Sequence, residues 1–136
     1  MFRLNGVDFE IDEDESYICF DDDHEVYLDI KTKLKEYNGD MHNPYVNINP
    51  IETNIKNKKE LIGFKFTVST IEEADEREDS FYLYEHEPFV EYKLEVKDIK
   101  GDKARILLKA IVVEDGYAKP YTTASLEVDC WLKLEC

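Results

Sequence analysis

The sequence predicts a single domain over residues 1–136 that is mainly β, either all-β or antiparallel α+β, with about seven antiparallel strands and at most one or two short helices. Three observations support this fold class. Several segments alternate apolar and polar residues with the period of two that half-buried strands show. Turn-forming pairs such as Asn5-Gly6 separate these segments. No alternation of strands with helices, the pattern of a parallel sheet, is present.

The N-terminal third is predicted to begin with a hairpin. Residues 2–4 and 7–11 flank Asn5-Gly6, which tolerates the two positive φ angles of a type I′ turn. A short apolar run over 17–20 follows, between two acidic turns. The next segment, 25–35, alternates apolar with mostly charged residues, so we expect a longer strand with one buried face.

The middle third predicts less regular structure. Residues 37–50 are rich in Asn, Gly and Pro and are predicted to be a connecting segment. Isoleucines near helical spacing predict one short helix within 51–60, and apolar alternation predicts a strand over 61–70. The acidic segment 72–79 has helix-compatible residues, so both a helix and a solvated loop stay open.

The C-terminal third has the strongest strand pattern. The segments 89–99, 104–114 and 122–135 alternate apolar and polar residues and are separated by Gly- and Pro-containing turns. Segment 104–114 is apolar on both faces at its centre, as in an interior strand of a sheet. Short connections between consecutive strands favour a three-stranded antiparallel meander.

Composition excludes several classes of function. The chain has 32 acidic and 17 basic side chains, a formal net charge of −15, with 43% hydrophobic and 12% aromatic residues. This apolar and aromatic content is inconsistent with intrinsic disorder. The negative charge disfavours direct nucleic-acid binding, which needs a basic surface for the phosphates, and it disfavours anionic membranes for the same reason.

Cysteine usage and hydropathy predict a compartment. Cys19, Cys130 and Cys136 are an odd number without zinc-ligand spacing, which predicts free thiols in a reducing cytosol and no metal site. The chain has neither an N-terminal apolar run of signal-peptide length nor the roughly 18 consecutive apolar residues of a membrane span. We therefore expect a cytoplasmic protein.

No catalytic motif is visible. The five glycines are scattered singly, which leaves no phosphate-binding loop, and no serine lies in a nucleophile elbow. The carboxylates lie in runs or on polar strand faces, where similar solvation gives them similar acidity. The acids beside His24, and the Glu85-His86-Glu87 triplet, alternate in direction along an extended chain and so do not form one coordination sphere. We expect a protein that is not an enzyme and uses no cofactor.

The placement of the acids is the most informative feature. From 8 to 25 there are ten acids and no lysine or arginine, and from 72 to 87 there are eight acids against Arg77 alone. Such segregation produces a field that steers a basic protein partner onto the surface, although an acidic surface that only maintains solubility is the alternative. Tyrosines near these segments are typical of binding hot spots. The candidate partner-binding residues are Asp12, Glu13, Asp14, Glu15, Asp21, Asp22, Asp23, Glu72, Glu73, Asp75, Glu76, Asp79, Tyr82 and Tyr84.

In size, acidity and strand content the chain resembles the immunity proteins of bacterial toxin–immunity pairs. The resemblance implies a cytosolic, non-catalytic protein that binds a cognate toxin, often a basic nuclease domain, and blocks its active site or substrate groove. Two alternatives stay open. A nucleic-acid mimic of the anti-restriction type would carry a continuous negative ridge. A β-barrel-like small-molecule binder or enzyme would enclose a large apolar cavity.

Overall fold

The computed structural model describes residues 1–136 and confirms that the chain is mainly β. Thirteen strands form, rather than about seven, because segments assigned to turns and connections also contain short strands. One α-helix, α1 (Ile71–Arg77), and one 3₁₀ helix, η1 (Lys58–Leu61), complete the fold. The strands are β1 (Phe2–Leu4), β2 (Val7–Phe9), β3 (Tyr17–Phe20), β4 (Glu25–Lys31), β5 (Lys35–Tyr37), β6 (Asp40–His42), β7 (Tyr45–Glu52), β8 (Lys65–Val68), β9 (Ser80–Tyr82), β10 (His86–Pro88), β11 (Glu91–Lys100), β12 (Lys103–Asp115) and β13 (Thr122–Leu134).

Eleven strands form one sheet, in which β10, β9, β7, β4, β3, β13, β12, β11 and β8 lie side by side in that order. β1 and β2 are added beside β13, while β5 and β6 pair only with each other. Two strands pair with the same edge of β13: β1 pairs with residues 126–128, and β3 pairs with residues 133–134. β1 is antiparallel to β13, whereas β3 is parallel to it. The sheet is therefore mixed rather than purely antiparallel.

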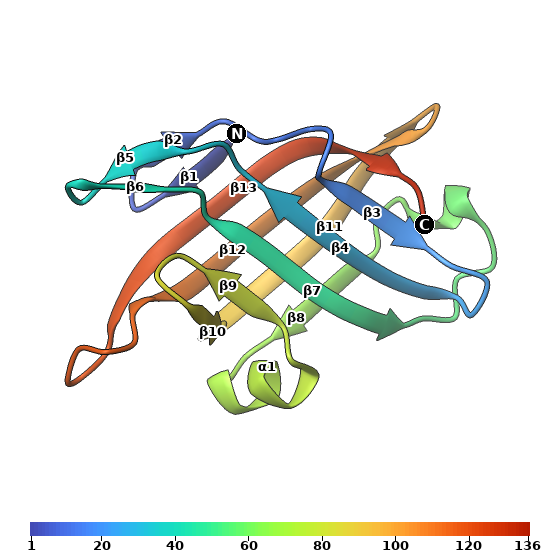
Figure 1. Cartoon of the computed structure of the whole chain (residues 1–136). Helices are drawn as coiled ribbons and strands as arrows, with labels where there is room; N and C mark the ends of the chain where they lie inside the picture. Colours follow the sequence, from blue (N-terminus) through green and yellow to red (C-terminus); the bar gives the residue numbers. More distant parts are fainter.

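The sheet curls until its two halves face each other. Figure 1 shows β3, β4, β7 and β9 in front of β11 and β12. Inward side chains from both halves meet in one core of 29 buried residues, with Leu28 and Val46 on the front half and Leu94, Ile106 and Leu108 on the back half. The main hollows are grooves on the surface rather than one large enclosed cavity of the kind a small-molecule-binding barrel requires.

The segment assigned to a connection over 37–50 contains strands, of which β7 is the longest. Pro44 precedes β7, and Pro50 lies at a bulge in it. The register pairs Val26 with Ile51 and Leu28 with Ile48, so two residues of β7 oppose one residue of β4 there. Prolines at a strand start and at a bulge are compatible with a sheet, because neither position needs the missing N–H.

The acidic segment over 72–79 is helical along most of its length. The hydroxyl of Thr70 accepts a hydrogen bond from the backbone N–H of Glu73 at 3.1 Å, and the Glu73 carboxylate accepts one from the N–H of Ser69 at 3.2 Å. This pair of bonds caps the N-terminus of α1. The short helix predicted within 51–60 is only the η1 turn at its end.

The prediction of three free thiols is wrong for two of the cysteines. Cys19 and Cys136 form a disulfide whose Cα atoms lie 4.9 Å apart, and only Cys130 is free. Cys19 lies on β3, and the terminal segment following β13 runs beside that strand, so the fold itself brings the two residues together. The inference of a reducing compartment loses its support with this bond. No helix of the protein combines the length and the apolar character that crossing a membrane demands.

Candidate partner-binding surface

Four half-buried tyrosines lie on the outward side of the front half of the sheet. Tyr27, Tyr45 and Tyr82 stand on β4, β7 and β9, at positions that alternate along each strand with buried apolar residues. Tyr17 stands on β3, where it lies opposite the half-buried Asp29 of β4. Alternation along a strand sends one set of side chains into the core and the other set outward. These four residues are called the tyrosine face below.

Strand register gathers these side chains into neighbouring rows. Tyr45 lies opposite Tyr82, which in turn lies opposite His86 on β10. The rings of Tyr82 and His86 are 4.9 Å apart, and those of Tyr17 and Tyr27 are 6.4 Å apart at right angles. Such edge-to-face and tilted pairs fix ring positions, so the tyrosine face is preorganised before any partner binds.

Asp29 lies at the centre of the tyrosine face. Its register partners are Tyr17 on β3 and Asn47 on β7. One carboxylate oxygen accepts a hydrogen bond from the Tyr17 hydroxyl at 3.2 Å, and the other accepts one from the Asn47 side-chain amide at 2.6 Å. Burial, followed by the charge of Asp29, raises the pKa of Tyr45 to about 12 and also raises the pKa of Tyr17. The hydroxyls of Tyr17 and Tyr45 therefore stay protonated and can donate hydrogen bonds at neutral pH.

Acidic segments lie on three sides of the tyrosine face. The loop over 12–15 leads into β3, the turn over 21–24 joins β3 to β4, and α1 leads into β9. Figure 1 shows the three segments above, to the right of and below the front strands. The side-chain amide of Asn49 on β7 donates to the backbone carbonyls of Arg77 and Glu78 at 3.1 and 2.8 Å, which holds the end of α1 against this half of the sheet.

The candidate residues predicted from sequence fall around this surface rather than in one patch. On the first loop, Asp14 and Glu15 form loose ion pairs with Lys133 and Lys31 at 3.8 and 3.9 Å. Asp22 and Asp23 are exposed in the β3–β4 turn. The remaining positions are the half-buried Asp12 and Asp21, the exposed Glu13 of the first loop, and the exposed Glu72, Glu73, Asp75 and Glu76 of α1.

The predicted tyrosines separate in the structure. Tyr82 belongs to the tyrosine face. Tyr84 lies in the β9–β10 turn, where its ring packs against His42 at 4.8 Å.

Asp79 does not belong to the contact surface. Its side chain is fully buried and pairs with Arg77 at 2.7 Å, so no partner can reach it in this structure. It also accepts hydrogen bonds from the backbone of Asn49 and the hydroxyl of Tyr92. A sequence records the charge of Asp79 and not its burial, which is why this residue was grouped with the exposed acids beside it.

Sequence reasoning missed most of the tyrosine face. Tyr27 and Asp29 are on the polar side of β4, which covers residues 25–31 of the strand predicted over 25–35, so their outward direction could have been read from the pattern. Tyr45 and Asn47 lie within the segment assigned to a connection, and no signal placed them beside Asp29. Pairing between β4 and β7 is a non-local property of the fold.

Three carboxylates converge in the β3–β4 turn, contrary to the sequence-based expectation. The side chains of Asp21, Asp23 and Glu25 place oxygens within 4.8 Å of one another. The Asp21 carboxylate accepts hydrogen bonds from the backbone N–H groups of Asp23 and Glu25, each at 3.0 Å. Burial and the neighbouring acids raise the pKa of Glu25. The Asp21 carboxylate therefore stabilises the turn by accepting these two backbone hydrogen bonds, and we assign no metal to the cluster.

One carboxyl pair differs in acidity. A hydrogen bond with Glu85, then burial, raises the pKa of Glu87 to about 7, whereas hydrogen bonds with Glu87 and Tyr117 lower the pKa of Glu85. A Cβ at Gly116 would collide with the Glu87 carboxylate, so this carboxyl packs directly on the β12–β13 loop. Two carboxyl groups that share a proton explain both shifts. The pair lies beside the β12–β13 loop, which contributes the Tyr117 hydroxyl to Glu85.

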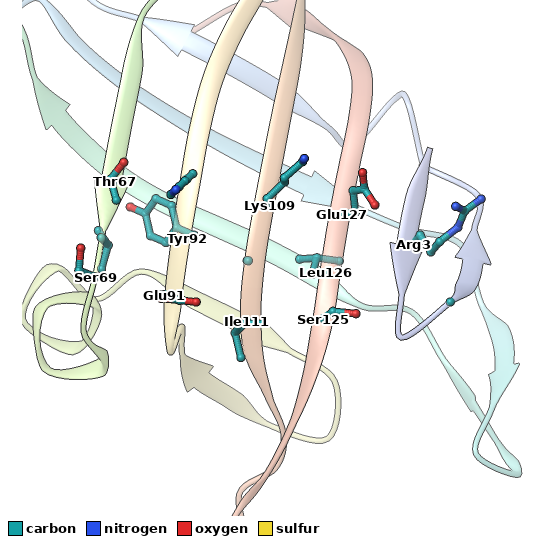
Figure 2. A pocket seen from close by; sticks show the side chains of 14 residues that line it. Arg3, Thr67, Ser69, Glu91, Tyr92, Lys109, Ile111, Ser125, Leu126 and Glu127 are labelled. Carbon is teal, nitrogen blue, oxygen red and sulfur yellow. The ribbon is translucent and has the colours of Figure 1, made fainter.

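The outward side of the back half has a different character. A groove of about 480 Å³ crosses β8, β11, β12, β13 and β1. Figure 2 shows the side chains that line it. Register aligns Thr67, Lys93, Lys109, Glu127 and Arg3 across these strands. The groove therefore carries mixed charge and no exposed tyrosine, and it supplies control positions for tests of the tyrosine face.

Comparison of the chain with protein-family models, curated proteins and solved structures finds no match.

Proposed function

We propose that the protein is a non-catalytic binding protein that neutralises a basic protein partner, in the manner of an immunity protein that inhibits a cognate bacterial toxin. The single observation that supports this proposal best is the tyrosine face with acidic segments on three sides. An aromatic centre bordered by like charges is the composition of a surface that recognises an oppositely charged protein.

The two parts of the surface have separate roles. Tyrosines in the centre of an interface bury large areas at a low cost in side-chain entropy and are enriched among residues whose truncation costs about 2 kcal/mol or more of binding energy. The exposed acids at the rim contribute mainly to the rate of association, because long-range attraction orients the approaching partner. A toxin domain with a cationic substrate cleft, such as a nuclease, has the matching charge.

The nucleic-acid mimic is the less favoured alternative. A mimic needs regularly spaced carboxylates along a continuous ridge, whereas the acids here lie on two separate loops and one short helix. Basic residues also line the opposite half of the sheet, where Lys93 lies opposite Lys109. A surface that is acidic on one side and mixed on the other favours one docking orientation over general imitation of DNA.

Charge reversal at the rim is expected to slow association with the partner. The double variants Asp22→Lys/Asp23→Lys and Glu72→Lys/Glu76→Lys each change the net charge by four and avoid the structural carboxylates Asp21 and Glu73. The partner to test is the product of the adjacent reading frame. Each double variant should lower the association rate constant by about tenfold at low salt, and the difference should vanish near 1 M salt, where the Debye length is about 3 Å.

The groove provides the matched control. Glu91→Lys/Glu127→Lys makes the same change in net charge on the opposite half of the sheet, and it should alter the rate by less than about twofold. Stopped-flow measurement over a salt series gives both quantities. If the two rim variants bound with the rate and salt dependence of the wild type, the proposed function would be wrong.

A further inference from the structure

We propose that Asp29 and the surrounding tyrosine rings form a receptor for one arginine side chain of the partner. This inference rests on the proposed function, since it names the group that the centre of the tyrosine face recognises. It uses a residue that lies outside the acidic segments and has a half-buried side chain.

The carboxylate of Asp29 has no cationic partner within the protein. Its hydrogen-bond donors are the hydroxyls of Tyr17 and Tyr45 and the amide of Asn47, all of them neutral. No lysine or arginine forms an ion pair with it, although seven such pairs are present elsewhere in the chain. A carboxylate offers about four acceptor sites, so Asp29 retains a free site beside these three donors. A half-buried negative charge with free acceptor sites favours an incoming cation.

The tyrosine rings already attract a cation from the chain itself. The ammonium group of Lys31 lies over the ring of Tyr45, 5.2 Å from its centre, while its ion pair with Glu15 is long at 3.9 Å. This contact indicates that the Tyr45 ring is open to a positive charge. Lys31 is partly exposed and held loosely, so a partner cation can displace it at little cost.

Arginine fits this arrangement better than lysine. A guanidinium is planar, stacks on an aromatic ring, and presents parallel N–H groups to both oxygens of a carboxylate. Asp29 retains an acceptor site for such a group, and tyrosine rings lie on β3, β4 and β7 around it. A lysine ammonium would reach one oxygen only and is more strongly hydrated, so it gains less from leaving water.

Two peptides of equal charge separate this receptor from general electrostatic attraction. Hexa-arginine and hexa-lysine are titrated into the wild-type protein at low salt, with fluorescence anisotropy of labelled peptides as the readout. We expect hexa-arginine to bind at least about fivefold more tightly. Asp29→Asn keeps the size of the side chain and removes its charge, and it should abolish this preference, whereas Asp22→Asn on the exposed turn should leave the preference intact.

A second variant distinguishes loss of the arginine site from loss of structure caused by the substitution at Asp29. Lys31→Ala removes the cation beside Tyr45 and should increase the affinity for hexa-arginine by about two- to threefold, a gain that a damaged surface would not produce. Three results would each contradict the proposed arginine site. They are equal affinity of the wild type for the two peptides, no binding of hexa-arginine, and a preference that Asp29→Asn retains. If rim charge reversal still slowed association with the partner, the proposed function would stand without it.

Discussion

Asp79→Ala is expected to lower the free energy of unfolding by about 3–5 kcal/mol, the range observed when one member of a buried ion pair is removed. The carboxylate of Asp79 is fully buried and accepts hydrogen bonds from Arg77 and from the backbone of Asn49 at 2.7 and 2.8 Å. Tyr92, itself buried, donates its hydroxyl to the same group. Alanine would leave all three donors without their acceptor in a water-poor site.

The effect follows from the position of Asp79 between elements. Its donors lie at the end of α1, on β7 and on β11, so one carboxylate joins the helix to both halves of the sheet. Urea unfolding monitored by circular dichroism measures the loss, which corresponds to a fall of roughly 10–17 °C in Tm for a domain of this size. The exposed neighbour provides the control, since Glu78→Gln should change stability by less than about 0.5 kcal/mol. A loss below about 1 kcal/mol for Asp79→Ala would show that the buried network contributes little.

Removal of the disulfide is expected to cost about 2–5 kcal/mol of unfolding free energy. Cys19 and Cys136 are separated by 117 positions, so the bond closes nearly the whole chain into a loop and restricts the unfolded state strongly. Cys136→Ser changes only the terminal residue and should show this loss in denaturant titrations. A reductant should destabilise the wild type by a similar amount and leave Cys136→Ser unchanged.

Thiol titration of the unfolded protein provides an independent check. The structure predicts one reactive thiol, that of Cys130, without reductant and three after reduction. Three thiols without reductant, together with equal stability of Cys136→Ser and the wild type, would contradict the disulfide. The measured loss also indicates whether the chain stays folded in a reducing compartment such as the cytoplasm.

Local patterns predicted much of the secondary structure. Asn5 and Gly6 adopt the positive φ angles of 49° and 81° expected of the hairpin turn, and β1 pairs with β2 around them. Alternation located β4 and the three long C-terminal strands, because inward and outward side chains differ in polarity along each of them. These features depend on neighbours in sequence, which a single chain displays directly.

The site depended on pairing between distant segments. Asp29 meets Tyr17 and Asn47 only because β4 lies between β3 and β7, and that order is not encoded in any local pattern. Cys19 and Cys136 were read as free thiols for the same reason, since their proximity follows from the parallel pairing of β3 with β13. The sequence identified the acidic segments, and only the fold revealed the aromatic surface that they border.

The central claim is that the tyrosine face binds the partner. Hydroxyl-radical footprinting of the complex with the product of the adjacent reading frame tests it most directly, because this method reports the exposure of each tyrosine separately. The account predicts that oxidation of Tyr17, Tyr27, Tyr45 and Tyr82 slows at least about threefold in the complex, in line with burial at the centre of an interface. Tyr121, which lies in the β12–β13 loop just before β13 and is 45% exposed, should be oxidised at the same rate as in the free protein. Unchanged oxidation of the tyrosine face in a complex that protects Tyr121 or the groove residues would contradict the account.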